Sequence, residues 1–271
     1  MKTKNRPEIP VADSPRPARR NPAQLRPVKI TVDYLEFADG SALIEMGRTR
    51  VLATATIEDR IPPFLKGTGT GWVTAEYAMI PRATEERTPR ERAGGKISGR
   101  SQEIQRLIGR SLRAVTDLGA LGERQIIIDC DVIQADGGTR AASVTAGCVA
   151  LGLALKKMLD LGLIDHMPLR HLVAGVSVGI VGGRALLDLE YVEDSAATLD
   201  MNIIETDRGE LVEVQAGAEK NPFSRKELLD LLKLADRGIA KLIQVQKEAL
   251  KKKSILFMAY GYREKNQPGP A

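Results

Sequence analysis

The segments rich in β-branched residues come in blocks, and this arrangement constrains the fold more than any other feature of the sequence. Four of them precede the first helical pattern, one stands between the first two helical patterns, and four follow the second. They predict strands at 28–37, 41–46, 51–57, 72–80, 124–133, 172–181, 185–189, 198–204 and 211–215. Strands in blocks, with helices that do not alternate regularly, indicate an α+β fold rather than a doubly wound sheet.

Three segments carry helical signals. Ser98 is a candidate N-cap for the first, whose apolar residues recur at helical spacing up to Val115. The second runs from about 139 to 161. The third begins at Ser224, whose spacing to Glu227 makes a capping box, and is expected to end near Lys253.

The composition suits one domain with a substantial core, which we expect over residues 21–253. Residues 1–20 are basic and proline-rich and predict a flexible arm, and residues 254–271 predict a disordered basic tail. The first twenty residues contain no apolar core of a signal peptide, and the apolar run at 172–183 is too short to span a bilayer. We therefore expect a soluble cytoplasmic protein with no membrane partner.

Cysteine and histidine are too rare for several kinds of chemistry. Cys130 and Cys148 lie in apolar segments and are expected to be reduced core thiols. With His166 and His171 as the only histidines, a structural zinc site and histidine-assisted nucleophilic catalysis are disfavoured.

Positive charge is concentrated inside the chain as well as at its ends. Residues 82–113 contain nine Lys and Arg residues and four Glu residues, in a protein with a net charge of +5. This stretch fits a surface that contacts an RNA backbone. It also fits a solvated helix face with ordinary ion pairs, and charge alone does not separate the two.

The loop and helix start at 136–140, Asp-Gly-Gly-Thr-Arg, are candidates for phosphate binding. Gly137 and Gly138 allow a tight turn whose amide N–H groups, together with the helix dipole, favour an anion. Thr139 adds a hydroxyl and Arg140 a guanidinium with the fork geometry that suits phosphate. The alternative is a plain glycine turn before a helix.

The first helix start repeats this arrangement, with Arg100 in its first turn after a glycine-rich segment that is not a Walker A loop. The two helix starts could converge on one small oxyanion. The alternative is that Arg100 forms an ordinary ion pair with Glu103 or another neighbouring acid.

Carboxylates cluster at a predicted strand end and the turn after it. They are Asp188, Glu190, Glu193, Asp194 and Asp200. Such oxygen ligands suit Mg²⁺, which keeps waters and shares substrate phosphates, although a solvated acidic turn is an equal alternative. With the phosphate candidates, they indicate phosphoryl chemistry without a protein nucleophile. If inorganic phosphate is the attacking group, positioning and electrostatics would supply most of the catalysis.

Three long ungapped runs, at 71–84, 96–110 and 128–140, resemble the bacterial RNase PH family. Asp194-Ser195 and Asp200-Met201-Asn202 continue the resemblance, which covers roughly residues 16–250. The resemblance implies a two-layer, sandwich-like fold of βαβ units, with mixed sheets packed against helices. It also implies a homohexameric ring, a trimer of dimers.

The implied activity is phosphorolytic 3′→5′ removal of nucleotides beyond the CCA end of tRNA precursors and from other RNA 3′ ends, rRNA included. Nucleoside diphosphates would be released, and the reverse nucleotidyl transfer is possible. By resemblance, Arg100, Gly138, Thr139 and Arg140 bind the phosphate, and Asp194 and Asp200 bind Mg²⁺ or Mn²⁺. Arg100, Arg140, Asp194 and Asp200 form the catalytic set. Arg82, Arg87 and Arg90 contact RNA or support the ring around it.

Three other functions remain open. The chain could be a core subunit of a larger phosphorolytic machine such as an exosome, a catalytically silent RNA-binding ring subunit, or a hydrolytic ribonuclease. An aromatic content of 4% disfavours base stacking as the main RNA contact and favours arginines that bind the backbone. RNA affinity should then fall steeply with salt.

Overall fold

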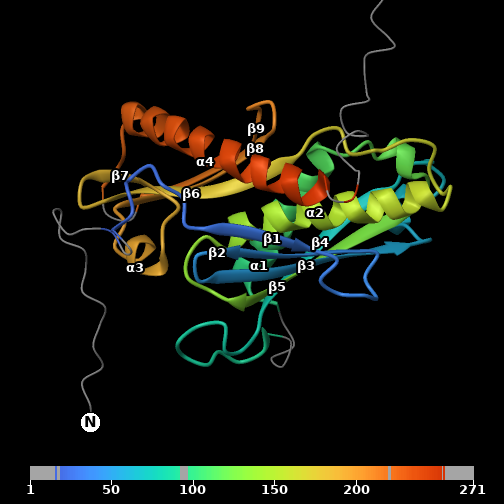
Figure 1. The fold of residues 1–271 in the computed structure, drawn as a ribbon, viewed down its shortest axis with the longest axis horizontal. Helices are drawn as coiled ribbons and strands as arrows, with labels where there is room; N and C mark the ends of the chain where they lie inside the picture. Colours follow the sequence, from blue (N-terminus) through green and yellow to red (C-terminus); the bar gives the residue numbers. More distant parts are fainter. Residues whose placement is uncertain (1–15, 17–18, 92–96, 219–220, 252, 254–271) are drawn as a thin grey trace, which may run out of the picture.

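Two β-sheets enclose a central helix in the computed structural model, which describes residues 16, 19–91, 97–218, 221–251 and 253 (Figure 1). The first sheet has the strand order β1-β2-β3-β5-β4 and the second the order β7-β6-β8-β9. The strands of the first sheet are β1 (Val28–Val32), β2 (Gly40–Met46), β3 (Thr49–Glu58), β4 (Trp72–Met79) and β5 (Gln125–Gln134). Those of the second are β6 (Val173–Val181), β7 (Arg184–Leu187), β8 (Leu199–Thr206) and β9 (Leu211–Ala218).

The helices separate the strands as the sequence predicts. They are α1 (Gly99–Ala114), α2 (Thr139–Asp160), the single-turn α3 (Tyr191–Asp194) and α4 (Arg225–Lys251), with short 3-10 turns at Pro63–Leu65 and Gly119–Leu121. The first sheet is mixed, because β4 pairs with β5 in parallel across the α1 crossover while its other pairs are antiparallel. The expected α+β fold, with mixed sheets packed against helices, is confirmed.

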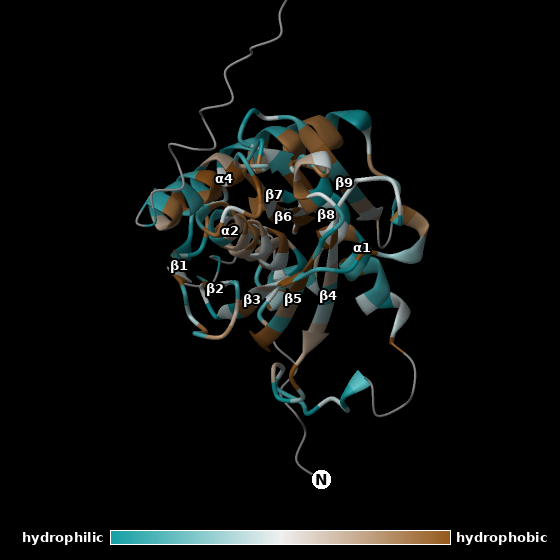
Figure 2. Ribbon diagram, turned by 90° about the vertical axis from the view of Figure 1, so that its right-hand side faces the viewer, coloured by the Kyte–Doolittle hydropathy of each residue, from teal (hydrophilic) through white to brown (hydrophobic). Residues whose placement is uncertain are grey.

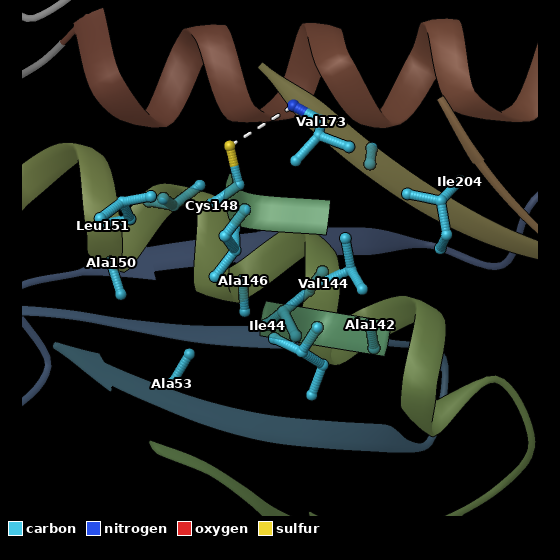
Figure 3. Close-up of a cluster of buried hydrophobic side chains, with 14 of the residues drawn as sticks. Ile44, Ala53, Ala142, Val144, Ala146, Cys148, Ala150, Leu151, Val173 and Ile204 are labelled. Atoms are coloured by element: carbon cyan, nitrogen blue, oxygen red, sulfur yellow. Dashed lines mark hydrogen bonds between the residues drawn. The ribbon is translucent and has the colours of Figure 1, made fainter. Parts of the chain in front are cut away.

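Helix α2 lies between the two sheets and is buried on all sides from Ala141 to Leu155. Ile44 and Ala53 of the first sheet face one side of it, and Val173 and Ile204 of the second face the other (Figure 3). Viewed from the side, α2 lies between the layers, while the outer faces of the surrounding helices carry hydrophilic residues (Figure 2). By length and composition α2 could cross a membrane, but 83% of its most apolar window is buried inside the fold. Its apolar surface is therefore accounted for by the core.

The helix caps expected from sequence are present. The Ser98 side chain accepts a hydrogen bond from the Ser101 N–H at the start of α1. At the start of α4, the Ser224 N–H donates to Glu227 Oε2 at 2.7 Å and the Glu227 N–H donates to Ser224 Oγ at 3.2 Å. Both caps satisfy amides that have no partner within the helix, so these ends are set by local sequence.

The first strand is shorter than expected. It ends at Val32 rather than near residue 37, because Asp33 adopts a left-handed conformation (φ 51°) and its N–H donates to the Ser41 carbonyl at 2.8 Å. The chain turns there toward β2. The β-branched pattern does not show where a backbone leaves the sheet, so the boundary was wrong by several residues.

The expectation of a flexible arm over residues 1–20 is wrong for Arg16 and Arg20. These side chains are only 5% and 6% exposed, and both form ion pairs with the buried Glu193. A buried guanidinium needs such partners, so this part of the segment belongs to the folded body. Residues 1–15 and the predicted tail at 254–271 lie outside the described residues.

Helix α4 meets the second sheet at a pair of carboxyl groups, Glu205 of β8 and Asp236. Burial, and then the hydrogen bond and charge of Asp236, raise the pKa of Glu205 from 4.5 to about 7. Because the folded value exceeds the unfolded one, stability is greatest below about pH 4.5 and falls as the pH rises toward 7. Glu205→Gln is expected to remove this loss. Above about pH 7 the variant's free energy of unfolding should therefore exceed that of the wild-type protein by an amount on the order of 2 kcal/mol. Urea unfolding of both proteins at about pH 5 and pH 8 tests this, and an equal difference at the two pH values would contradict it.

Candidate active site

The loop before α2 is shaped by two consecutive glycines in the left-handed region. Gly137 has φ 77° and Gly138 φ 69°, and Gly138 is the N-cap of α2. A Cβ on Gly137 would lie 2.4 Å from the Leu189 carbonyl oxygen, so the loop passes directly against the turn that leads to α3. Gly138 has no side chain to cap the helix, which leaves the first-turn N–H groups for a bound anion.

A buried tyrosine joins the two helix starts. The hydroxyl of Tyr77 on β4 lies 2.9 Å from Thr139 Oγ1. Burial raises the pKa of Tyr77, while the Thr139 hydrogen bond and the charges of Arg100 and Arg140 oppose that rise. The charges of both arginines therefore act on the same hydroxyl that hydrogen-bonds to Thr139.

The guanidinium of Arg140 is held in place from one side. Its Nη1 donates to Gln215 Oε1 at 2.9 Å, and it lies 3.7 Å from Glu103 Oε1. Gln215 Nε2 in turn donates to the same Glu103 oxygen at 2.7 Å. Glu103 thus pairs with Arg140 rather than with Arg100, so the alternative of an Arg100–Glu103 ion pair is wrong.

Arg100 is exposed in the first turn of α1 and forms no ion pair with any residue that the structure describes. Its positive charge is therefore not neutralised by a neighbouring carboxylate. Together with Arg140, which is partly exposed, it gives the start of α2 two guanidinium groups that can bind an anion.

Asp200 lies on the sheet face that meets this site. Asn202 pairs directly with Gln215, and Asp200 pairs directly with Gly217 in the same two strands. Residues that pair across strands, and residues two apart within a strand, share a face. Asp200 therefore projects to the same side as Gln215, which contacts Arg140, and a Cβ on Gly217 would lie 3.2 Å from its Oδ1.

Asp194, the other predicted metal ligand, is the exposed last residue of α3. Within the described part of the chain, no group of three or more His, Cys, Asp or Glu side chains is arranged to hold a metal ion. Two carboxylates still fit Mg²⁺ or Mn²⁺, because Mg²⁺ sites commonly use one or two carboxylates and complete their shell with water and substrate phosphates. Asp194 and Asp200 remain the candidate ligands.

The three loop arginines predicted to contact RNA are exposed. Arg82 donates to the Glu85 carbonyl at 2.9 Å. Burial raises the pKa of Asp131 on β5, and the charge of Arg90 opposes this, so Arg90 lies near that sheet face. Their RNA contact stays a prediction.

Sequence reasoning missed Tyr77, Gln215 and a buried polar network behind the loop. Asp188 appeared among the candidate metal ligands, but it is fully buried and forms a bidentate ion pair with Arg26. Glu193, from the same group, is buried against Arg16 and Arg20. The only signal in the sequence was the excess of acids at one strand end, and it does not distinguish a metal ligand from a buried ion-pair partner.

Gly137→Ala is expected to destabilise the protein strongly, because the new Cβ meets both an unfavourable φ and the Leu189 carbonyl. Gly183→Ala is the matched control. Gly183 also has a positive φ (74°), but a Cβ there would meet no heavy atom within 4 Å. We expect Gly183→Ala to cost about 1 kcal/mol and Gly137→Ala at least twice that. Thermal unfolding of both variants measures the difference, and equal costs would show that the contact with Leu189 is unimportant.

Comparison with known proteins identifies the family of this chain. Two RNase PH models of the 3′ exoribonuclease family match the chain, domain 1 over residues 24–156 and domain 2 over residues 171–238. Among similar solved structures is the Archaeoglobus fulgidus exosome with RNA bound to the active site. It has 24% identity and a TM-score of 0.73, and the match covers 86% of this chain and 92% of that one.

Two further similar structures are rice (Oryza sativa) Rrp46 and an archaeal exosome core. The first has 19% identity and a TM-score of 0.69, with 85% of this chain and 98% of that one covered. The second has 23% identity and a TM-score of 0.68, with 84% and 89% covered. At these identities the structural likeness shows the fold. The two family models show more: this chain is a member of the 3′ exoribonuclease family and carries both of its RNase PH domains in order.

Proposed function

We propose that the protein is a phosphorolytic 3′→5′ exoribonuclease of the bacterial RNase PH kind. The observation that carries this proposal is the Tyr77 hydroxyl, which lies 2.9 Å from Thr139 Oγ1 at the start of α2 and experiences the charges of Arg100 in α1 and Arg140 in α2. Two guanidinium groups, a hydroxyl and helix amides suit a small multiply charged oxyanion. In a family of 3′ exoribonucleases, inorganic phosphate is the anion that such a site would hold as a reactant.

In this reaction an oxygen of inorganic phosphate attacks the phosphorus of the last phosphodiester. The bond from that phosphorus to the 3′ oxygen of the preceding nucleotide breaks, and the 3′ oxygen takes up a proton. The products are a nucleoside diphosphate and an RNA one nucleotide shorter. Arg100 and Arg140 hold and orient the attacking phosphate and stabilise negative charge on it, so no protein nucleophile is required.

Asp194 and Asp200 would hold Mg²⁺ or Mn²⁺. When bound, the ion would neutralise charge on the scissile phosphate. Asp200 is the better defined of the two, because it projects from β8 on the same face as Gln215. The chain's own contribution is to keep these carboxylates beside the anion site without a third protein ligand.

RNA is expected to bind mainly through its backbone. Arg82, Arg87 and Arg90 offer three exposed guanidinium groups on one loop, which fits weak sequence preference and strong salt dependence. The proposed substrates are tRNA precursors with nucleotides beyond the CCA end, rRNA and other structured RNA 3′ ends. Synthesis from nucleoside diphosphates is the same reaction in reverse.

We propose a cytoplasmic homohexamer, built as a trimer of dimers. The second candidate is a subunit of an exosome-like ring, and it is favoured by the likeness to exosome structures. Native mass spectrometry of the purified chain separates the two. A homomeric ring supports the first, and a monomer or dimer that assembles only with other chains supports the second.

Product analysis on a 3′-extended RNA tests the activity. The RNA is incubated with Mg²⁺, with and without inorganic phosphate, and with excess chelator as a control. Nucleoside diphosphates that appear only with phosphate and Mg²⁺ support phosphorolysis. Nucleoside monophosphates formed without phosphate would identify a hydrolase instead, and RNA binding with no product under any condition would identify a silent ring subunit.

A further inference from the structure

Arg26, just before β1, lies behind the phosphate loop and is only 3% exposed. Its Nε and Nη2 donate to the two carboxylate oxygens of Asp188 at 2.9 and 2.6 Å. Its Nη1 donates to the Asp136 carbonyl at 2.5 Å, and its Nη2 also reaches the Gly137 carbonyl at 3.3 Å. One guanidinium therefore joins the phosphate loop to a buried carboxylate from the turn before α3.

These contacts determine which way the loop amides point. In a trans peptide the carbonyl oxygen and the next N–H point in opposite directions. With the carbonyls of Asp136 and Gly137 turned toward Arg26, the N–H groups of Gly137 and Gly138 must point away from it. Thr49 adds to this hold, because its hydroxyl donates to the Gly137 carbonyl at 2.7 Å and accepts from the Asp136 N–H at 3.0 Å.

The carboxylate end of this link is also held firmly. Asp188 is fully buried in a left-handed conformation (φ 56°), and its N–H donates to the Ser177 carbonyl at 2.7 Å. Its own carbonyl accepts from Arg16 and Arg20 at 3.2 and 3.1 Å. A strained, fully buried residue with this many partners is a fixed anchor, and Arg26 transmits its position to the loop.

We propose that Arg26 is a positioning residue for the attacking phosphate, an inference that rests on the phosphorolytic function proposed above. It does not touch the phosphate, because its guanidinium is buried and its donors are already engaged by Asp188 and the loop. Instead it holds the Gly137 and Gly138 amides and the first turn of α2 in the orientation that binds the anion. Arg100 and Arg140 then meet a phosphate whose place is already defined.

Two variants test the proposal, so that the test does not depend on either one folding correctly. Arg26→Lys keeps a charge beside Asp188 but cannot reach the carboxylate and both loop carbonyls at once. The double variant Arg26→Gln/Asp188→Asn removes both charges and so leaves no unpaired buried ion. In each, the dissociation constant for inorganic phosphate is measured by calorimetry, with KM for phosphate, kcat and RNA affinity. We expect phosphate affinity to fall about tenfold and KM for phosphate to rise in parallel, with RNA affinity unchanged.

Leu242→Ala is the matched control, because Leu242 is fully buried in α4 and its truncation destabilises the fold without touching the loop. It should lower the melting temperature and leave phosphate affinity unchanged. Unchanged phosphate affinity in both Arg26 variants would overturn the positioning role, and so would an equal loss of phosphate affinity in Leu242→Ala. Neither result would contradict phosphorolysis by the wild-type protein. A wild-type protein that neither binds phosphate nor uses it would overturn the proposed function itself, and the role of Arg26 with it.

Discussion

Arg140→Ala is expected to lower phosphate-dependent release of nucleoside diphosphates by a factor on the order of 10³. The guanidinium lies in the first turn of α2 beside Thr139. There it can bind the attacking phosphate and stabilise the negative charge that develops during transfer. Gln215 holds it from one side at 2.9 Å, so its orientation is defined before phosphate arrives. Initial rates over a range of phosphate concentrations, with products separated by anion-exchange chromatography, measure the loss.

The fold should tolerate this change, since Arg140 is partly exposed and its ion pair with Glu103 is long, at 3.7 Å. Thermal unfolding of Arg140→Ala should therefore stay close to that of the wild-type protein. Arg60→Ala is the matched control, because Arg60 is an exposed arginine that pairs with Glu58 at the C-terminal end of β3. Activity that survives in Arg140→Ala, or that falls equally in Arg60→Ala, would contradict a role in phosphate binding.

Glu193→Ala is expected to cause the largest loss of stability, about 3 to 5 kcal/mol, because it leaves Arg16 and Arg20 buried without this shared partner. Arg16 donates to both Glu193 oxygens, at 2.7 and 2.9 Å, and Arg20 donates to one at 3.1 Å. Glu193 also closes the capping box of α3 through the Glu190 N–H. Urea unfolding at neutral pH measures the effect, and a change below about 1 kcal/mol would show that the Arg16–Arg20 segment contributes little.

The contribution of Glu193 and its two arginine partners to stability depends on pH in a defined way. Burial is the largest single effect on Glu193 and opposes its ionisation. The hydrogen bond from Arg16, the Glu190 N–H and the charges of Arg16 and Arg20 together outweigh it and lower the pKa of Glu193 below 4.5. Its contribution is therefore present above about pH 4.5 and is lost as the pH falls through the lowered value. Glu193→Gln keeps the shape and removes the charge. The variant should have a lower free energy of unfolding than the wild-type protein at neutral pH. The difference between the two free energies should become smaller as the pH falls into the acid range.

The features that sequence predicted best depend on neighbouring residues in the chain. The Ser98 cap, the Ser224–Glu227 capping box and the apolar stripe of α1 each involve residues within a few turns of one another. The glycine turn before α2 is of the same kind, since Gly137 and Gly138 carry in their residue type the freedom that their positive φ values require. Local geometry therefore gave the helix starts correctly, and phosphate binding at these starts stays a prediction.

The contacts that assemble the site are between residues far apart in the sequence. Tyr77 meets Thr139, Gln215 meets Arg140, and Arg26 meets Asp188 across 162 positions. Nothing in the local pattern around Arg16, Arg20 or Arg26 distinguishes a buried ion-pair partner from a solvated charge, and so the segment that contains Arg16 and Arg20 was expected to be a flexible arm.

The sequence by itself determined the fold class, the helix ends and the residue types of an anion site, because periodicity, capping and backbone freedom are local properties. The tertiary structure decided which charges are buried, which acids pair with which arginines and which side of each strand faces the site. Those outcomes depend on strand register and on the packing of α2 between the two sheets. In that setting, desolvation makes an unpaired charge too costly to keep.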